Sequence, residues 1–254
     1  MKITLVESSV GSGKQLQVLA SYIINDVVVL DVGSIGFVSP VEVQRRIKHV
    51  LISHSHIDHT ASLPIFLDNV YAPGQDCVRI YGSEGLLECL QTHIFNDRVW
   101  PDMIRLSKDE TPFRRLYYLE DETPVEIENL KITPVELDHI VPTFGFVVED
   151  QDAAIAFVSD TRPTQKIWSI VNQTENLRAV FLEASFPNSM EWLANKAHHL
   201  TPSLFLDEVR KLNADVPIIA IHIKPAFEAE VISELKSLKL PNLQIGIPGR
   251  TYSF

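Results

Sequence analysis

The sequence has few of the features that mark secreted, membrane or disulfide-rich proteins. It contains only two cysteines, Cys77 and Cys89, among 254 residues. Their separation is not that of a zinc knuckle and a single pair makes no disulfide framework, so we expect buried or free thiols in a reducing compartment. No apolar run approaches the ~20 residues of a membrane helix, and the first residues show no secretory leader pattern. We therefore expect a cytoplasmic protein without membrane contact.

Basic residues are also scarce, with 22 Lys and Arg against 33 Asp and Glu and a formal net charge of −11. An acidic surface repels polyphosphate, so binding of large nucleic acids is not expected. A small anionic substrate stays compatible with this charge if bound metal reverses the sign at the site. The length and the 45% hydrophobic content allow one α/β domain spanning residues 1–254.

Apolar, β-branched segments separated by turn residues predict strands in both halves of the chain. These strands are expected at Met1–Val6, Ser21–Leu30, His49–Ser53, Leu130–Leu137, Thr143–Glu149, Ala153–Ser159, Ala179–Glu183 and Val216–Ile221. Helical spacing and capping residues predict helices at Thr60–Asn69, Ser83–Phe95, Thr164–Asn172, Ser189–Ala197, Thr201–Leu212 and Phe227–Leu238. Prolines at 101, 112 and 124 indicate an irregular insertion. This order predicts an α/β fold in which two sheets pack face to face under helices.

One short segment concentrates the titratable residues of the first half. HSHIDH directly follows the apolar run HVLIS and contains His54, His56, Asp58 and His59. Because alternate side chains of an extended segment share a side, the first three are expected to point the same way, with His59 turning in as a helix begins. Imidazole and carboxylate are ligands for Zn²⁺ or Mn²⁺, whereas a solvated turn favours Ser, Asn, Lys or Gly. The segment therefore predicts a metal site.

Three further polar residues occur where predicted strands of the second half end. His139 follows KITPVEL, Asp160 closes AIAFVS, and His222 follows VPIIAI. Ligands at the ends of several apolar strands would meet at one edge of a sheet sandwich. His49 and His93 have no such context and are interpreted as surface or helix residues.

The pattern HxHxDH, a distant His, an Asp that closes a strand and a final His resembles the metallo-β-lactamase superfamily of di-metal hydrolases. The resemblance implies a single-domain, four-layer αββα sandwich. It also implies that one metal is held by His54, His56 and His139, the other by Asp58, His59 and His222, with Asp160 bridging them. Two divalent ions are expected, with Zn²⁺ preferred and Mn²⁺ as the alternative.

Later motifs narrow the choice of branch. LEASFPN and HHLTP are similar to the segments that flank the metals in phosphodiesterase branches, and HIFNDRVWP resembles an insertion of class II 3′,5′-cyclic-nucleotide phosphodiesterases. Glu183 would then orient a proton-donating histidine, for which His199 is preferred and His198 is the alternative. The same likeness implies substrate contacts from His199, Asn96 and Trp100. For Trp100, core packing is the preferred interpretation, and a wall of the nucleotide pocket or a dimer contact is the alternative.

The resemblance therefore implies hydrolysis of a cyclic nucleotide such as cAMP or cGMP to the 5′-monophosphate. Asp58 would position the attacking water and accept its proton, and His199 would protonate the leaving oxygen. An RNase Z-like RNA endonuclease, another phosphodiester hydrolase and a metal-stabilised nucleotide-binding protein are the alternatives. GSGK at 11–14 lacks the full phosphate-loop pattern and predicts a glycine hairpin. The base preference, the physiological metal and a homodimeric assembly stay open.

Overall fold

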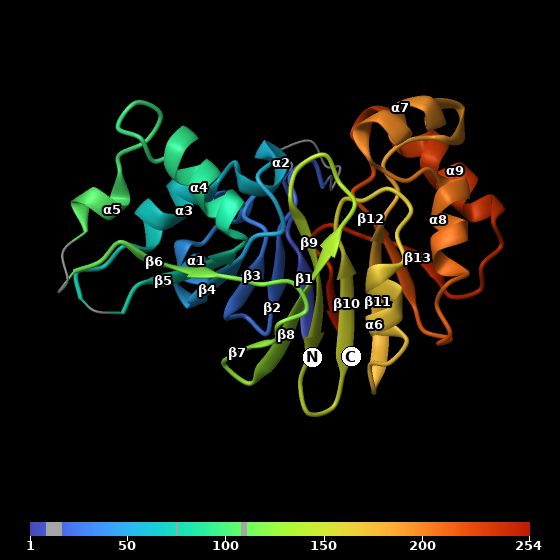
Figure 1. Ribbon diagram of the computed structural model, residues 1–254, viewed down its shortest axis with the longest axis horizontal. Coiled ribbons are helices and arrows are strands. Elements are labelled where there is room, and N and C mark those ends of the chain that lie inside the picture. The colour runs from blue at the N-terminus through green and yellow to red at the C-terminus, as the bar shows by residue number, and fades with distance from the viewer. Residues whose placement is uncertain (9–16, 75, 108–110) are drawn as a thin grey trace. The chain divides into compact units, whose positions relative to one another are not determined.

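The computed structural model describes residues 1–8, 17–74, 76–107 and 111–254, which form two compact units. The N-terminal unit comprises residues 2–119 and 248–253, and the C-terminal unit comprises residues 120–247 with residues 1 and 254. Each unit contains one mixed seven-stranded sheet, and Figure 1 labels the elements. The GSGK segment, predicted as a glycine hairpin, lies outside the described residues.

The N-terminal sheet has the strand order β14-β1-β2-β3-β4-β5-β6. Its strands are β1 (Lys2–Leu5), β2 (Tyr22–Ile24), β3 (Val28–Leu30), β4 (His49–Leu51), β5 (Val78–Gly82), β6 (Arg114–Tyr118) and β14 (Thr251–Ser253). The first four in the sheet order pair antiparallel, whereas β3 to β6 run parallel. The carboxyl ends of β3 and β4 therefore meet at one edge, and the HSHIDH segment begins there.

Residues 21–30, predicted as one strand, form a hairpin of β2 and β3. Asn25 and Asp26 both have positive φ, 49° and 62°. The turn occupies residues 25–27, between the paired residues Ile24 and Val28, and Asn and Asp tolerate the positive φ that it requires. The prediction was wrong because the turn contains no glycine or proline to mark it.

Helices cover one face of the N-terminal sheet. They are η1 (Ile35–Phe37), α1 (Val41–Arg46), α2 (Ile57–Thr60), α3 (Leu63–Val70), α4 (Glu84–His93) and α5 (Met103–Leu106). Phe66 of α3 and Leu90 of α4 are buried in one cluster with Val50 and Ile80 of the sheet. Ser83 caps α4, as predicted, by accepting a hydrogen bond from the Leu86 amide at 3.2 Å.

Two expectations for this unit need correction. The helix predicted over 60–69 is two helices, α2 and α3, separated at Ala61 and Ser62. The segment with three prolines, expected to be irregular, contains α5 and the strand β6. Pro112 and Pro124 lie before and after the paired residues of β6, so they remove no amide donor from its pairing with β5.

The C-terminal sheet has the strand order β13-β12-β11-β10-β9-β8-β7. Its strands are β7 (Val125–Ile127), β8 (Leu130–Leu137), β9 (Thr143–Glu149), β10 (Ala154–Val158), β11 (Leu177–Glu183), β12 (Ile218–Ile221) and β13 (Leu243–Ile245). Strands β7 to β10 pair antiparallel, and β10 to β13 pair parallel. The parallel part again brings the carboxyl ends of four neighbouring strands to one edge.

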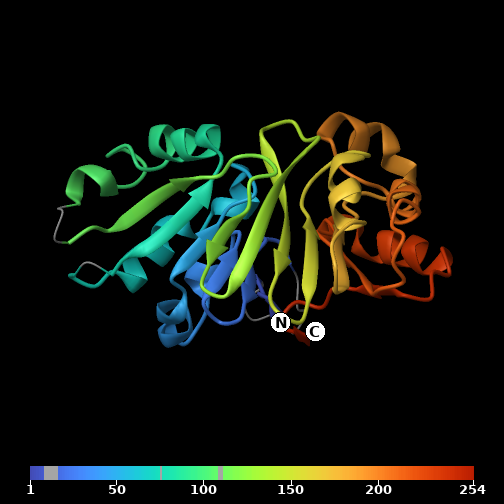
Figure 2. The same cartoon turned by 60° about the horizontal axis from the view of Figure 1, so that its bottom comes forward.

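Helices also pack on the C-terminal sheet. They are α6 (Lys166–Val171), η2 (Asn188–Met190), α7 (Glu191–Ala197), α8 (Pro202–Val209), η3 (Pro225–Phe227) and α9 (Glu228–Ser237). Trp168 of α6, Phe205 of α8 and Val231 of α9 are buried in one cluster with sheet residues. In Figure 2 the orange to red helices of this unit lie to one side of the yellow strands. Thr201 caps α8 and Pro202 opens it, as predicted.

Both cysteines are free, with Cys77 buried and Cys89 partly buried, as the composition predicted. Within the described ranges, no helix has the length and apolar character required to cross a membrane.

Candidate metal and catalytic site

The predicted ligands of the N-terminal unit lie just beyond β4. His54 and His56 belong to the loop, His56 is the N-cap residue of α2, and Asp58 and His59 lie in that helix. The prediction of one extended run was therefore wrong for Asp58, because the chain becomes helical at residue 57. His49, expected on the surface or in a helix, is a buried residue of β4 whose Nδ1 lies 3.1 Å from the Tyr81 hydroxyl.

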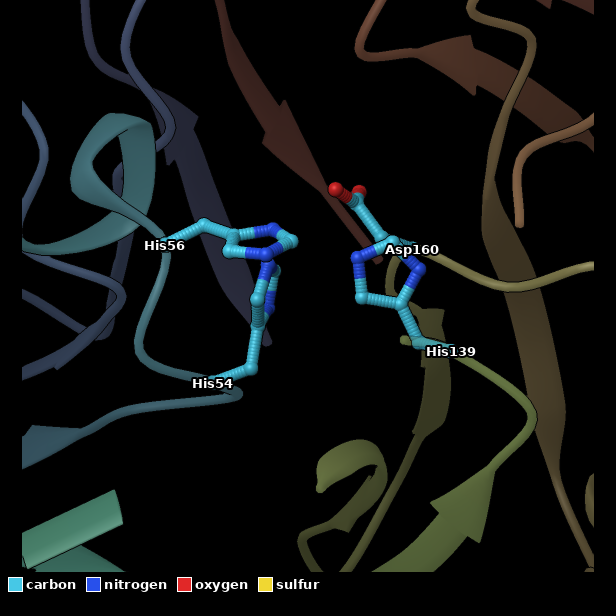
Figure 3. Close-up of side chains that lie close together, drawn as sticks. All are labelled: His54, His56, His139 and Asp160. Atoms are coloured by element: carbon cyan, nitrogen blue, oxygen red, sulfur yellow. The ribbon is translucent and has the colours of Figure 1, made fainter. Parts of the chain in front are cut away.

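Three imidazole rings converge in this loop. The ring centroid of His54 lies 4.7 Å from that of His56 and 4.1 Å from that of His59. His54 and His59 are buried, with 0% and 2% of their surface exposed. Figure 3 shows the His54 and His56 rings side by side, and a nitrogen of each lies within 4.8 Å of the other. Imidazole nitrogens this close together make a good set of donors for a divalent ion.

Backbone contacts hold the ligand loop against the preceding segments. The Ala20 amide donates to the Asp58 carbonyl at 2.8 Å, and the Val32 amide donates to the His59 carbonyl at 2.8 Å. A Cβ atom at Gly33 would lie 2.1 Å from the Asp58 carbonyl oxygen. Glycine is therefore required at position 33, because any side chain would displace the loop that carries the predicted ligands.

Asp31, which the sequence reasoning missed, orients the loop that contains the HSHIDH segment by accepting hydrogen bonds from it. His59 Nδ1 donates to Asp31 Oδ2 at 2.7 Å, and Ser53 donates to the same carboxylate from its amide at 2.8 Å and its hydroxyl at 2.9 Å. The Asp31 side chain is buried and its φ is 57°. The signal was present, since Asp31 directly follows the strand VVVL as Asp160 follows AIAFVS.

The C-terminal unit supplies polar residues at the ends of its own strands. Glu183 is the last residue of β11, and His139, Asp160 and His222 follow β8, β10 and β12. Figure 3 shows the Asp160 carboxylate beside the His139 ring, with donor atoms within 4.8 Å of each other. Donor atoms of His199 and His222 also lie within 4.8 Å of Asp160, and Asp160 Oδ1 is 3.5 Å from His222 Nδ1. His139 and His222 at the strand ends, together with His199 between α7 and α8, therefore lie around one buried carboxylate.

Glu183 is the hydrogen-bonding centre of this group. Its side chain is fully buried, and His199 Nδ1 donates to Oε1 at 2.9 Å. The other donors are the Thr161 amide at 2.9 Å, the Ser185 hydroxyl at 2.7 Å and the Leu200 amide at 3.3 Å. Four donors compensate the burial of one carboxylate, and they fix its orientation.

The His199 ring is held in a strongly anionic environment. Burial lowers its pKa, but the adjacent Glu183 carboxylate, and then Asp160, raise it more, so the pKa of His199 lies above its ordinary value. Asp160 Oδ2 lies 3.9 Å from His199 Nδ1. With Nδ1 bound to Glu183, Nε2 is the ring atom that can exchange a proton with another molecule.

His198 occupies a different position from its neighbour. It ends α7 in the left-handed region with φ 52°, and its Nδ1 lies 3.3 Å from Asp138 Oδ1. Its carbonyl accepts a hydrogen bond from His139 Nδ1 at 2.9 Å. His198 therefore positions His139 through its backbone, whereas His199 is the residue paired with Glu183.

The predicted substrate contacts lie in the segment after α4. Asn96 accepts hydrogen bonds from the Arg98 and Val99 amides at 3.0 and 2.9 Å, so its side chain organises a turn. Trp100 is partly buried against the core cluster of the N-terminal unit. These contacts give both residues a structural role, and their contact with substrate stays a prediction.

The donor groups fit divalent metal ions. In four of the predicted ligand histidines the Nδ1 atom is already bound to protein, which leaves Nε2 as the ligand atom. These contacts join His54 to the Ser53 hydroxyl at 3.0 Å, His59 to Asp31 at 2.7 Å, His139 to the His198 carbonyl at 2.9 Å and His222 to the Ser185 hydroxyl at 3.0 Å. Ser53 and Ser185, which the sequence reasoning missed, serve the two units in the same way.

Comparisons with known proteins agree with this chemistry. The model of the beta-lactamase superfamily domain matches residues 35–223, more than half of the chain. A probable 3′,5′-cyclic-nucleotide phosphodiesterase of Yersinia pestis is 26% identical over 234 residues, covering 80% of this chain and 64% of that protein. A ribonuclease Z of Lactobacillus johnsonii is 31% identical over 110 residues, covering 42% of this chain and 32% of that protein. The crystal structure of unliganded yeast PDE1 matches 98% of both chains, with a TM-score of 0.79 and 16% identity.

The two mixed sheets and their helices have the architecture of the metallo-β-lactamase fold, as the sequence predicted. The chain belongs to the beta-lactamase superfamily. It spans less than two thirds of the Yersinia pestis protein. The prediction of one domain over residues 1–254 stays a prediction.

Proposed function

We propose that the protein is a di-metal phosphodiesterase that hydrolyses 3′,5′-cyclic nucleotides to nucleoside 5′-monophosphates. The buried Glu183–His199 pair beside Asp160 is the observation that carries the proposal, because an oriented imidazole next to a carboxylate that we assign to the metals is suited to proton donation. Similarity to the Yersinia pestis phosphodiesterase over most of this chain supports the choice of substrate.

The resemblance to the superfamily gives the assignment of the ligands. One ion is assigned to His54, His56 and His139, the other to Asp58, His59 and His222, and Asp160 is assigned to both, with Zn²⁺ preferred over Mn²⁺. Two divalent ions supply an activated water and neutralise the phosphoryl oxygens when they are bound. Together they carry more charge than Asp58 and Asp160, so a small anion is attracted although the protein is acidic overall.

The protein groups have separate tasks in the hydrolysis. Asp58 positions the attacking water and accepts its proton as the water oxygen bonds to phosphorus. The bond between phosphorus and the ribose 3′ oxygen breaks, and His199 Nε2 gives its proton to that leaving oxygen. Glu183 holds His199 through Nδ1 and stabilises its charged form before the transfer.

A ribonuclease Z-like endonuclease is the second candidate. The chain is 31% identical to a ribonuclease Z of Lactobacillus johnsonii, and this similarity covers 42% of the chain. Long RNA carries one phosphate per nucleotide, and binding it requires a matching set of Lys and Arg. The net charge of −11 therefore favours the small cyclic substrate.

Hydrolysis of cAMP and cGMP by metal-free and metal-reconstituted protein tests the proposal. We expect activity only after Zn²⁺ or Mn²⁺ is added, and loss of that activity in the variant Asp160→Ala. The variant His199→Ala should retain its metal while turnover falls about 10²–10⁴-fold, the usual contribution of a positioned acid. Full activity of Asp160→Ala would contradict the di-metal assignment, and metal loss in His199→Ala would make that histidine a ligand.

A further inference from the structure

The strand β6 forms one edge of the N-terminal sheet. It pairs with β5 on its inner side, and no other strand of the described residues pairs with its outer side. In Figure 2 the green β6 lies beside the teal β5. The side chains of Tyr117 and Tyr118 are 39% and 63% exposed. An exposed edge of this kind, rich in aromatic residues, is a template for pairing with another strand.

The register with β5 fixes which backbone groups of β6 point outward. The Leu119 amide donates to the Gly82 carbonyl at 2.9 Å, so residue 119 faces β5. Because successive residues of a strand direct their amide and carbonyl groups to opposite sides, Arg115 and Tyr117 also face β5. Arg114, Leu116 and Tyr118 therefore direct theirs to the outer edge.

These three outward-facing residues are spaced symmetrically about Leu116. If a second copy of β6 pairs antiparallel with the first, Leu116 lies opposite Leu116, and Arg114 lies opposite Tyr118 of the second copy. All three positions are then hydrogen-bonded pairs of an antiparallel ladder, so the outward groups of both strands satisfy one another.

The side chains of the strand RRLYY are complementary in the same register. Exposed Arg115 lies opposite Tyr117 of the second copy, where a guanidinium and an aromatic ring attract each other. A parallel arrangement in register would instead place the arginines of the two strands side by side, where like charges repel. The charge pattern therefore selects the antiparallel pairing.

A hollow beside the strand leaves room for the second copy. It has a volume of about 370 Å³ and is lined by Leu87 and Gln91 of α4 and by Leu116 and Tyr118 of β6, among others. Tyr118 of the second copy would lie on this side of the sheet, opposite Arg114. Burial of the exposed tyrosines in both copies adds apolar contact to the backbone hydrogen bonds.

We propose that two copies of the chain pair through β6, antiparallel about Leu116, to form a symmetric homodimer with one continuous sheet. The proposal rests on the N-terminal unit alone and does not depend on the proposed reaction. A closed two-fold arrangement would also protect the edge from aggregation, because each copy covers the edge of the other.

Sedimentation velocity over a range of protein concentrations tests this dimer. The wild-type protein is expected to sediment with twice its chain mass of 28.7 kDa. Tyr118→Pro removes one outward amide donor from each copy, whereas Tyr118→Ala keeps it. The dimer dissociation constant of Tyr118→Pro should exceed that of Tyr118→Ala about thirtyfold, the loss of two hydrogen bonds of ~1 kcal/mol each.

The neighbouring position is a control for the register. The Tyr117 amide faces β5, so Tyr117→Pro should lower the melting temperature, whereas Tyr118→Pro should melt close to Tyr118→Ala. If Tyr118→Pro does not fold, Tyr118→Lys tests the proposal instead. This variant keeps the backbone amide and places a second cation opposite Arg114, so it should be monomeric. A monomeric wild-type protein, or dimers of unchanged affinity in the folded Tyr118→Pro or in Tyr118→Lys, would overturn the proposal.

Discussion

Glu183→Gln should reduce both the stability of the protein and the turnover of the proposed reaction. The carboxylate accepts hydrogen bonds from four donors and is fully buried. An amide of the same shape has one oxygen, so two donors would face an NH₂ group. At about 1–3 kcal/mol for each donor left unsatisfied, folding stability should fall by about 2–6 kcal/mol. This corresponds to a decrease in melting temperature of roughly 5–20 °C for a chain of this size.

The effect on turnover follows from the loss of orientation at His199. If the amide nitrogen replaces Oε1, the His199 ring loses both its hydrogen bond and its charged partner. If it replaces Oε2, the ring keeps the hydrogen bond but loses the charged partner. Proton donation weakens in both cases. We expect kcat for cAMP hydrolysis to fall about 10²-fold or more, with metal content close to that of the wild type. The measurements are steady-state kinetics below the melting temperature, thermal unfolding and metal analysis of the same samples.

Glu208→Gln is a matched control for this variant. Glu208 is also fully buried in the C-terminal unit, where it accepts hydrogen bonds from Trp168 Nε1 at 2.6 Å and the Thr164 amide at 3.3 Å and pairs with Lys211. Its replacement should lower the melting temperature similarly and change kcat by less than about twofold. Equal losses of kcat in the two variants, or full activity of the Glu183 variant, would refute the assigned role.

Two further predictions concern the ligand loop. Asp31→Asn should weaken metal affinity about 10–100-fold in a chelator competition, because His59 loses the carboxylate that orients it; unchanged affinity would contradict this role. Gly33→Ala should abolish metal-dependent activity and lower the melting temperature, since its Cβ would lie 2.1 Å from the Asp58 carbonyl oxygen. Gly85 lies in helix α4 with open space around its Cβ position, so Gly85→Ala should raise the stability by about 0.5–1 kcal/mol. If the two alanine variants behave equally in unfolding and activity assays, the steric argument for Gly33 is contradicted.

The features that could be predicted from the sequence are those that depend on residues close together in the chain. The HSHIDH segment could be interpreted as a candidate ligand cluster because its three histidines lie within six consecutive residues. The helix caps at Ser83 and Thr201 could be predicted because Ser and Thr are preferred N-cap residues. The pairing of Glu183 with His199 was expected from a motif resemblance, and their hydrogen bond has the geometry that this expectation requires.

Features that depend on distant segments escaped prediction. Asp31 follows a strand as Asp160 does, but its partners could not be predicted, since only the pairing of β3 with β4 brings its carboxylate to Ser53 and His59. Likewise, Ser185 becomes a partner of His222 only when β11 and β12 lie side by side. Such contacts are set by tertiary structure, and a single sequence does not display them.

The central claim concerns the substrate, and kcat/KM of the metal-loaded protein measures it most directly. The comparison should include 3′,5′-cyclic AMP and GMP, 2′,3′-cyclic nucleotides, a generic phosphodiester, a thioester and a precursor tRNA under identical conditions. The account predicts the highest kcat/KM for a 3′,5′-cyclic nucleotide, with a nucleoside 5′-monophosphate as the product. Cleavage of the precursor tRNA without hydrolysis of any cyclic nucleotide would contradict it.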